Sequence, residues 1–289
     1  MKNIFQQIEM YNKLENKGYL VTDLLNACEV QALRDIYLKY QIQIPNHFFS
    51  SSFIPDESIR KSISREIQAV IRPKINGLLQ NHKELGAVFL VKPVGSNTQM
   101  PIHQDWTVAD EPEYQTITAW IPLQDTTVQN GAITVLPGSH KLSTGLRSPS
   151  LEDSLADIKD IAAPLMQTLE MKAGQAFIFT HALLHASHPN LSENNRIAVA
   201  YGITHQSTDL IYFHKPSPHA KVQKLAIPDD FFISYPEPGK PPAHSRLIEE
   251  FDYKENKISI AEFNRFYGIK TSLWDKMKKS LSAPFQVFR

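Results

Sequence analysis

Between residues 86 and 205 the chain alternates short apolar runs with turn signals, and this pattern constrains its fold more than any other feature. Residues 87–91 form the clearest run. Similar runs, rich in β-branched or aromatic residues, lie at 99–104, 115–124, 131–136, 175–180 and 196–204. Each has the length and composition of a strand, and turns such as Asn130 and Gly131 separate them. Because most of these runs have no periodic helix between them, they favour an antiparallel sandwich or barrel over a doubly wound parallel sheet.

Helical patterns lie mainly before this strand-rich region. Apolar residues recur at helical spacing over 30–37, and Asn26 can cap that helix with Glu29 as its capping-box partner. A second helix is predicted at about 57–80. The N-terminal part is therefore expected to pack helices around a β core.

The length of 289 residues predicts one domain with elaborations, and such a chain can bury a sizeable core. Within residues 1–289 we expect a helical N-terminal part at about 1–85, a barrel at about 86–205 and a less regular C-terminal elaboration at about 206–289, with a helix at 259–268. A polar insertion at about 141–168, helical in part at 151–162, is expected to cross over the outside of the barrel.

Charge and cysteine content limit the partners and the compartment of this protein. Lys plus Arg and Asp plus Glu both number 30, so the zero formal charge gives no electrostatic reason to expect a nucleic acid or an anionic membrane as partner. No apolar run has a signal-peptide or membrane-spanning pattern. Cys28 is the only cysteine, which excludes an intramolecular disulfide and favours a reducing compartment. We expect a cytoplasmic monomer or homodimer that acts on a small molecule.

His103 and Asp105 are two residues apart, so on a strand their side chains project from the same face. His185, just after the apolar run at 175–180, is the preferred third ligand, ahead of His181. Two histidines and one carboxylate on one face of an octahedron leave open positions, which suits a non-haem Fe(II) site that activates O2. The spacing of His103 and Asp105 alone is weak evidence, because a solvated strand face has the same pattern.

Arg196 lies eleven residues after His185, at the start of the run at 196–204. A strand that turns back beside the metal would bring this guanidinium near the open positions. Arginine is suited to holding a carboxylate with two parallel hydrogen bonds, and a 2-oxo acid that chelates iron at one end needs a cation at the other. The alternative is a surface arginine paired with Glu193.

Taken together, these motifs resemble the phytanoyl-CoA dioxygenase family of Fe(II)/2-oxoglutarate-dependent oxygenases. Five stretches carry the resemblance: the opening segment at 18–25 with the helix after it, the HxD motif at 103–105, the run at 120–140 with its NG and PGSH turns, the AGQ segment at 173–175, and the distal H-x-S-x-x-N…R pattern at 185–196. The resemblance covers roughly residues 15–205. It implies a mainly β fold with flanking helices: a double-stranded β-helix, which is a jelly-roll, cupin-like barrel, with N-terminal helices packed outside.

The resemblance also implies roles for individual residues. The implied iron ligands are His103, Asp105 and His185. Residues expected to contact 2-oxoglutarate are Arg196, Ser187, Gln99, Lys92 and Trp120. Residues expected to line the substrate pocket are Gln104, Trp106, Tyr114 and Phe49. Trp106 and Tyr114 flank a polar loop that is expected to close over substrate, with a plain surface loop as the alternative.

The implied reaction is hydroxylation of an unactivated C–H bond, in which 2-oxoglutarate and O2 are consumed and succinate and CO2 are released. Desaturation, cyclisation and epoxidation use the same ligands and stay open as alternatives, as do a non-oxidative metal-dependent cupin enzyme and a ligand-binding barrel. The presence of Asp105 argues against the halogenating relatives, which lack the carboxylate. The preferred substrate is a natural-product or amino-acid-like metabolite, with apolar and anionic parts suggested by aromatic residues beside His205, His214 and Lys215.

Overall fold

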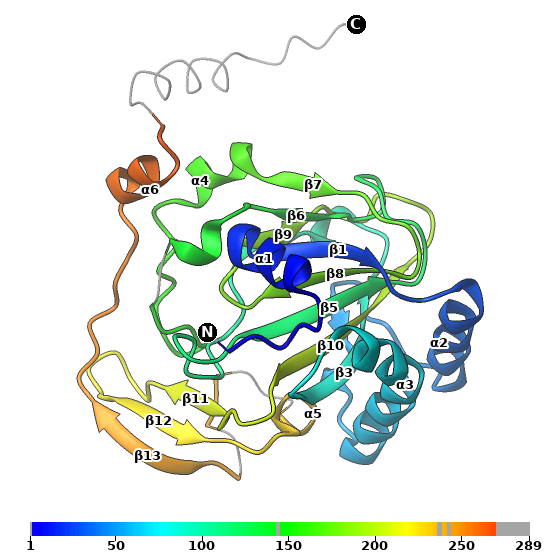
Figure 1. Ribbon diagram of the computed structural model, residues 1–289, viewed down its shortest axis with the longest axis horizontal. Helices are drawn as coiled ribbons and strands as arrows, with labels where there is room; N and C mark the ends of the chain where they lie inside the picture. The colour runs from blue at the N-terminus through cyan, green and yellow to red at the C-terminus, as the bar shows by residue number, and fades with distance from the viewer. Residues whose placement is uncertain (1, 143–144, 236–238, 242–243, 270–289) are drawn as a thin grey trace, which may run out of the picture.

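Two facing antiparallel sheets form the centre of the computed structural model, which describes residues 2–142, 145–235, 239–241 and 244–269 (Figure 1). The larger sheet contains, in order across it, β1 (Tyr19–Asp23), β8 (Gln175–Thr180), β5 (Thr116–Pro122), β10 (Arg196–His205), β3 (His82–Lys92) and β2 (Phe49–Ser50). The smaller sheet contains β4 (Met100–His103), β9 (His185–Ser187), β6 (Ile133–Val135) and β7 (Gln167–Leu169). This arrangement confirms the predicted mainly β, jelly-roll class.

The two ends of the chain contain more strand than the sequence pattern predicts. β1 lies in the part predicted to be helical, yet it pairs with β8 and places Tyr19 opposite Phe179. β3 begins at His82, before the predicted start of the barrel. The C-terminal part forms a third sheet of β11 (Ile211–His214), β12 (Val222–Ala226) and β13 (Arg246–Phe251), where a less regular chain is predicted. Its residues 270–289 lie outside the described part of the chain.

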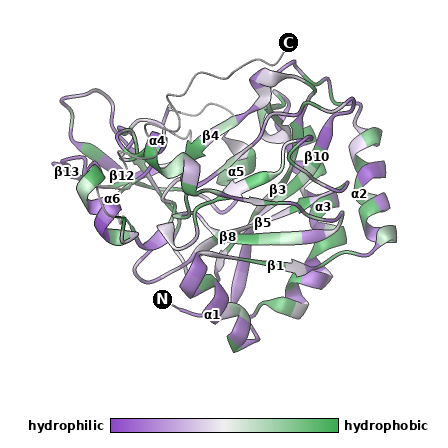
Figure 2. Cartoon of the chain, turned by 90° about the horizontal axis from the view of Figure 1, so that it is seen from above, coloured by the Kyte–Doolittle hydropathy of each residue, from purple (hydrophilic) through white to green (hydrophobic). Residues whose placement is uncertain are grey.

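The N-terminal helices pack outside the larger sheet, as predicted. α1 (Ile8–Lys17) contacts β1, α3 (Glu57–Leu78) contacts β3, and α2 (Ala27–Lys39) packs on α3. The predicted capping box is present at the start of α2, where Asn26 accepts from the backbone of Glu29 and Glu29 accepts from the backbone of Asn26. In Figure 2 both α2 and α3 carry green and purple residues, as amphipathic helices do when one face covers a core.

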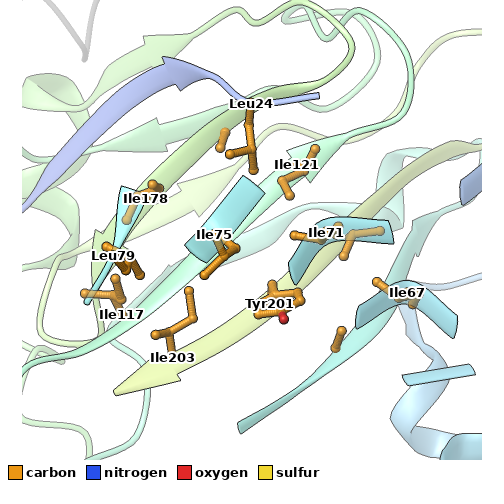
Figure 3. Close-up of a cluster of buried hydrophobic side chains, with 14 of the residues drawn as sticks. Leu24, Ile67, Ile71, Ile75, Leu79, Ile117, Ile121, Ile178, Tyr201 and Ile203 are labelled. Carbon is orange, nitrogen blue, oxygen red and sulfur yellow. The ribbon is translucent and has the colours of Figure 1, made fainter. Parts of the chain in front are cut away.

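The contact between α3 and the larger sheet decides which strand face is left for the site. Ile67, Ile71 and Ile75 recur every four residues on α3, are fully buried, and pack in one cluster with Ile117 of β5 (Figure 3). Successive residues of a strand point to opposite faces. Thr118, the next residue of β5, therefore points away from α3 and toward the smaller sheet.

The polar insertion contains less helix than predicted. Within 151–162 only α4 (Lys159–Ala162) is α-helical. Leu155 and Ile158 of the insertion cluster with Phe263 of α6 (Ile260–Phe266), the helix predicted at 259–268. Among the described helices, none combines the length and the apolar content that a membrane crossing requires.

Candidate functional site

β4 and β9 of the smaller sheet bring the three predicted ligands together. The two strands pair so that His103 lies opposite His185, and their imidazole rings are 4.2 Å apart between centroids. Asp105 follows β4 on the same face, and its Oδ1 lies 3.8 Å from Nε2 of both His103 and His185. One ligand atom from each of the three residues lies within 4.8 Å of the others. The cluster is therefore a candidate metal centre.

Backbone carbonyls orient the two imidazoles. Nδ1 of His103 lies 2.8 Å from the carbonyl oxygen of Pro101, and Nδ1 of His185 lies 3.0 Å from that of Leu183. A neutral imidazole that donates from Nδ1 presents the lone pair of Nε2, which is the form that binds a metal. Both Nε2 atoms are thereby directed to the same centre as the carboxylate of Asp105.

The protonation states of the cluster suit metal ligands. Burial, together with the electrostatic influence of the neighbouring His103, lowers the pKa of His185 to about 4, so its ring is neutral at pH 7. Burial opposes ionisation of Asp105, but the histidines around it and Arg147 outweigh this effect and hold the pKa of its carboxyl below the usual value. A neutral imidazole and an ionised carboxylate are the forms that coordinate metals.

Arg147 of the polar insertion holds the segment that carries Asp105. Its Nε donates to the backbone carbonyl of Asp105 at 2.7 Å, and its Nη atoms donate to the carboxylate of Glu111. Its backbone also pairs with Thr107. No sequence motif singles out Arg147, because nothing in the spacing of a polar insertion signals a contact 42 residues away.

Arg196, the first residue of β10, is buried, with 2% of its surface exposed. Its guanidinium lies 5.1 Å from the ring of Trp120, and neither Nε nor Nη1 has a hydrogen-bond partner among the described residues. Burial lowers its pKa to about 10, so it remains a cation at pH 7. The alternative of a surface arginine paired with Glu193 is therefore wrong. A buried cation with free donors is costly unless an anion binds it.

Lys92, the last residue of β3, lies beside Arg196 in the strand register and is fully buried. Its Nζ donates to Oγ of Ser187 at 2.6 Å and to the backbone carbonyl of His188. Burial and the charge of Arg196 lower the pKa of Lys92 to about 7. The structure thus brings the predicted residues Lys92, Ser187 and Arg196 together, and it places no carboxylate from the described residues in hydrogen-bond contact with them.

A cavity of about 400 Å³ lies between the two sheets and contains the metal cluster. Five predicted residues besides the ligands line it: Gln104, Trp106, Trp120, Ser187 and Arg196. Lys92 reaches the cavity through its bond to Ser187 and is not itself part of the lining.

Besides Lys92, three predicted site residues do not line the cavity. Gln99 is exposed to solvent just before β4. The Tyr114 hydroxyl accepts from Lys2, and its ring packs on His205, away from the cluster. Phe49 is replaced in the lining by its neighbour Phe48, because adjacent residues of an extended segment point to opposite sides.

Further lining residues come from segments that no sequence motif connects to the site. These are Ser52 and Phe53 of the short helix η1 (Ser51–Phe53), together with Phe232, Ile233 and Tyr235 in and just after α5 (Phe231–Ser234). In the sequence, the adjacent aromatic residues Phe231 and Phe232 at the start of α5 are the local feature that suggests a binding surface. The basic residues His205, His214 and Lys215, which suggest an anionic part of the substrate, are not in the lining, and Lys215 pairs with Glu255 at 2.6 Å.

His181, the competitor for the third ligand position, has a different environment. It lines the cavity, its Nε2 lies 3.2 Å from Oγ1 of Thr118, and its Nδ1 lies 3.2 Å from the backbone carbonyl of Trp106. Both ring nitrogens are thus engaged with protein atoms, and His181 is not part of the described three-residue metal cluster.

Known proteins have sequences similar to part of this chain. Residues 14–198 match the family model described as phytanoyl-CoA dioxygenase (PhyH). The chain is 28% identical over 135 residues to the phytanoyl-CoA dioxygenase domain-containing protein 1 homolog of Dictyostelium discoideum, covering 44% of this chain and 48% of that protein. It is 29% identical over 119 residues to phytanoyl-CoA dioxygenase 1 of Oryza sativa subsp. japonica, covering 39% and 42%. The chain thus spans about half the length of the curated relatives it matches.

Solved structures with the same fold cover most of the chain. The carbocyclase SnoK from nogalamycin biosynthesis aligns with a TM-score of 0.51 at 20% identity, over 84% of this chain and 96% of that one. The epimerase SnoN, in complex with Fe3+, alpha ketoglutarate and nogalamycin RO, aligns with a TM-score of 0.53 at 16% identity, over 87% and 97%. At these identities the likeness establishes the fold. The family model extends over more than half of the chain and includes all of the clustered ligands and Arg196, so the chain belongs to the phytanoyl-CoA dioxygenase family.

Proposed function

We propose that this protein is an Fe(II)- and 2-oxoglutarate-dependent dioxygenase that hydroxylates a C–H bond of a small molecule. The observation that carries the proposal is Arg196: a buried guanidinium with two unpartnered nitrogens lines the same cavity as the His103, Asp105 and His185 cluster. A cavity with a candidate metal centre and a buried, unsatisfied cation suits an acid that chelates the metal at one end. Membership of the family supports the same assignment.

The three clustered residues fit iron. Two imidazoles and one carboxylate are the donor set that non-haem Fe(II) oxygenases use with open positions. The ligand atoms lie within 4.8 Å of one another, a spacing that small side-chain rotations can close around one ion. When bound, iron and 2-oxoglutarate supply the chemistry that reduces O2 and releases succinate and CO2.

Lys92, Ser187 and Arg196 fit the far carboxylate of 2-oxoglutarate. Arg196 offers its free Nε and Nη1, and Ser187 already accepts a hydrogen bond from Lys92. In this proposal an entering carboxylate forms charge-assisted bonds with the guanidinium and offsets the repulsion between the two buried cations. Trp120 packs against Arg196 and restricts its orientation. The surrounding apolar lining excludes water from the reacting groups.

Turnover of the cosubstrate tests the proposal directly. Purified protein supplied with Fe(II), 2-oxoglutarate and O2 is expected to release succinate slowly without substrate, and omission of Fe(II) or O2 should abolish that release. A non-oxidative cupin enzyme or a ligand-binding barrel would give none. Product analysis by mass spectrometry then distinguishes hydroxylation from desaturation, epoxidation or the ring closure and epimerisation for which SnoK and SnoN are named.

An Arg196→Met variant tests the cosubstrate site independently of turnover. Loss of a charge-assisted pair is expected to raise the Kd for 2-oxoglutarate about 10- to 100-fold, measured by calorimetry on protein loaded with Zn(II). Arg72→Met is the matched control, because Arg72 pairs with Glu84 outside the cavity. An unchanged Kd in Arg196→Met would place 2-oxoglutarate elsewhere and remove the main support for the proposal.

A further inference from the structure

Iron and 2-oxoglutarate account for the acidic and basic side chains that line the cavity, apart from His181. Among the lining residues that the structure describes, the acidic and basic ones are the three clustered ligands, Arg196 and His181. His181 is hydrogen-bonded on both sides by Thr118 and the Trp106 carbonyl. Once a dianionic cosubstrate has bound Arg196, the described lining offers no further fixed cation to a substrate.

Much of the remaining lining is apolar, and five of its residues form one surface. We call this surface the aromatic wall, and its members are Phe48, Phe53, Phe232, Ile233 and Tyr235. Two segments far apart in the sequence build it, one around β2 and η1 and the other at α5, and these segments are in contact. Trp106 closes the corner next to the metal cluster, with its ring 6.3 Å from that of Tyr235 in an edge-on arrangement.

Arg60 of α3 joins the two halves of the aromatic wall from behind. It is buried, its Nε donates to the carbonyl of Ile233 at 2.6 Å, and its Nη1 donates to the carbonyls of Ile54 at 2.6 Å and Pro55 at 2.9 Å. Its donors are engaged by backbone oxygens, and Arg60 does not line the cavity. The wall is thus a connected surface, with a fixed relation between its halves.

Polar groups beside the wall are neutral and already paired with protein atoms. Oγ of Ser50 lies 2.7 Å from Oγ of Ser52, and Nε2 of Gln104 donates to the carbonyl of Ala182. Such groups can share a hydrogen bond with a hydroxyl or carbonyl. They cannot neutralise a carboxylate or phosphate, whose burial without a counter-charge is strongly unfavourable.

We infer that the substrate is a neutral, largely apolar small molecule whose body packs on the aromatic wall. Hydroxyl, carbonyl or amide groups are compatible with this lining, whereas a carboxylate or phosphate group inside the cavity is not. The inference rests on the proposed function for the position of the reacting bond, and it replaces the sequence-based expectation of a substrate with an anionic part.

Three probes with one apolar body test the charge preference: 2-naphthylmethanol, 2-naphthylacetate and 2-naphthylmethylammonium. Each is titrated by calorimetry into protein loaded with Zn(II) and 2-oxoglutarate, so that binding is measured without turnover. The neutral probe is expected to bind at least about tenfold more tightly than 2-naphthylacetate, because the carboxylate finds no counter-charge, and at least as tightly as the ammonium probe. Equal affinities of the neutral probe and 2-naphthylacetate, preference for a charged probe, or no binding by any probe would each overturn the inference.

Variants test whether the aromatic wall is the binding surface. Phe232→Ala is expected to weaken the neutral probe about tenfold or more through lost ring contacts, and Phe232→Leu to weaken it less. Phe232→Leu also serves if the alanine variant does not fold. Phe266→Ala, which truncates an exposed phenylalanine of α6 outside the cavity, is the control and should bind like the unchanged protein.

The same variants separate this inference from the proposed function. The Kd for 2-oxoglutarate and the slow succinate release, measured on the unchanged protein and on Phe266→Ala, report on the proposed function alone, because Phe266 lies outside the cavity. If Phe232→Ala binds the neutral probe normally, the aromatic wall is not the binding surface, and the oxygenase assignment is unaffected. Failure of succinate release in the unchanged protein would instead reject the oxygenase.

Discussion

Nε of Arg147 donates a hydrogen bond of 2.7 Å to the backbone carbonyl of Asp105, the residue that supplies the carboxylate of the candidate metal centre. The backbone N–H of the same aspartate donates to the carbonyl of His181 at 2.8 Å. Both sides of the Asp105 backbone are therefore held by segments distant in the sequence. This restraint limits how far the carboxylate can move from His103 and His185.

Replacement of Arg147 is expected to weaken metal binding without removing a ligand. Arg147→Gln should raise the Kd for Fe(II) or Co(II) about 10- to 100-fold, the range seen when groups that orient metal ligands are lost. Anaerobic titration followed by the Co(II) absorption spectrum measures the change. Lys159→Gln is the control, since Lys159 belongs to the same insertion but pairs with Asp153 at its surface. A variant with lower stability but unchanged metal affinity would limit Arg147 to a structural role.

Alanine substitutions distinguish the third ligand from its competitor. His185→Ala is expected to lose stoichiometric iron, because it removes one of three ligands and leaves a site with two. His181→Ala should retain iron, since both nitrogens of His181 are engaged by Thr118 and the Trp106 carbonyl. Metal analysis after gel filtration measures the iron content of both variants. The reverse result, iron kept in His185→Ala and lost in His181→Ala, would exchange their roles.

Binding of 2-oxoglutarate is expected to take up a proton at Lys92 above neutral pH. The pKa of Lys92 is lowered to about 7 in the folded protein, so its amine is largely neutral at pH 8.5, whereas a bound carboxylate favours the protonated form. Affinity for 2-oxoglutarate should therefore fall as pH rises above about 7. Calorimetry at pH 8.5 in buffers of different ionisation enthalpy should give uptake of nearly one proton. Lys92→Met should abolish the uptake; if it persists, another group is responsible.

The lowered pKa of Lys92 also predicts how the free energy of unfolding changes with pH. An unfolded chain keeps the lysine protonated up to its ordinary pKa near 10.5, while the folded protein has released that proton above about 7. The unfolded state thus binds more protons between these values, so the contribution of Lys92 to the free energy of unfolding rises with pH across this window and is least favourable below it. Comparison of urea unfolding at pH 6.5 and 9 should show this rise, and Lys92→Met should reduce it.

The core between α3 and the larger sheet should dominate stability. Ile71→Ala is expected to lower the free energy of unfolding by about 2–5 kcal/mol, because Ile71 is fully buried and its loss leaves a cavity. Ile59→Ala on the same helix should cost about 0.5 kcal/mol or less, since 37% of Ile59 is exposed. Urea unfolding followed by circular dichroism measures both. Similar losses for the two variants would contradict the packing described for α3.

Local patterns in the sequence were sufficient for the strands of the barrel and for the pair of candidate ligands at the end of β4. The two-residue period of a strand places His103 and Asp105 on one face wherever that strand lies, and the capping box of α2 involves residues three apart. These features depend on backbone geometry that each segment carries by itself. His185 begins β9 and Arg196 begins β10, the next strand along the chain, so the spacing between them is also a local feature.

Contacts between distant segments were decided only by the tertiary structure. Arg147 reaches Asp105 because the insertion folds back over β4, and the aromatic wall joins Phe48 to Phe232 because α5 packs against η1 and α3. Phe48 and Phe49 are adjacent, so only one of them can face the cavity. The pairing of β2 with β3 decides which one does. The sequence alone predicted the family and the fold class, which are confirmed, and it named the three candidate ligands that the structure brings together. Long-range packing determined which side chains surround the substrate, since no local period encodes a contact across more than a hundred residues.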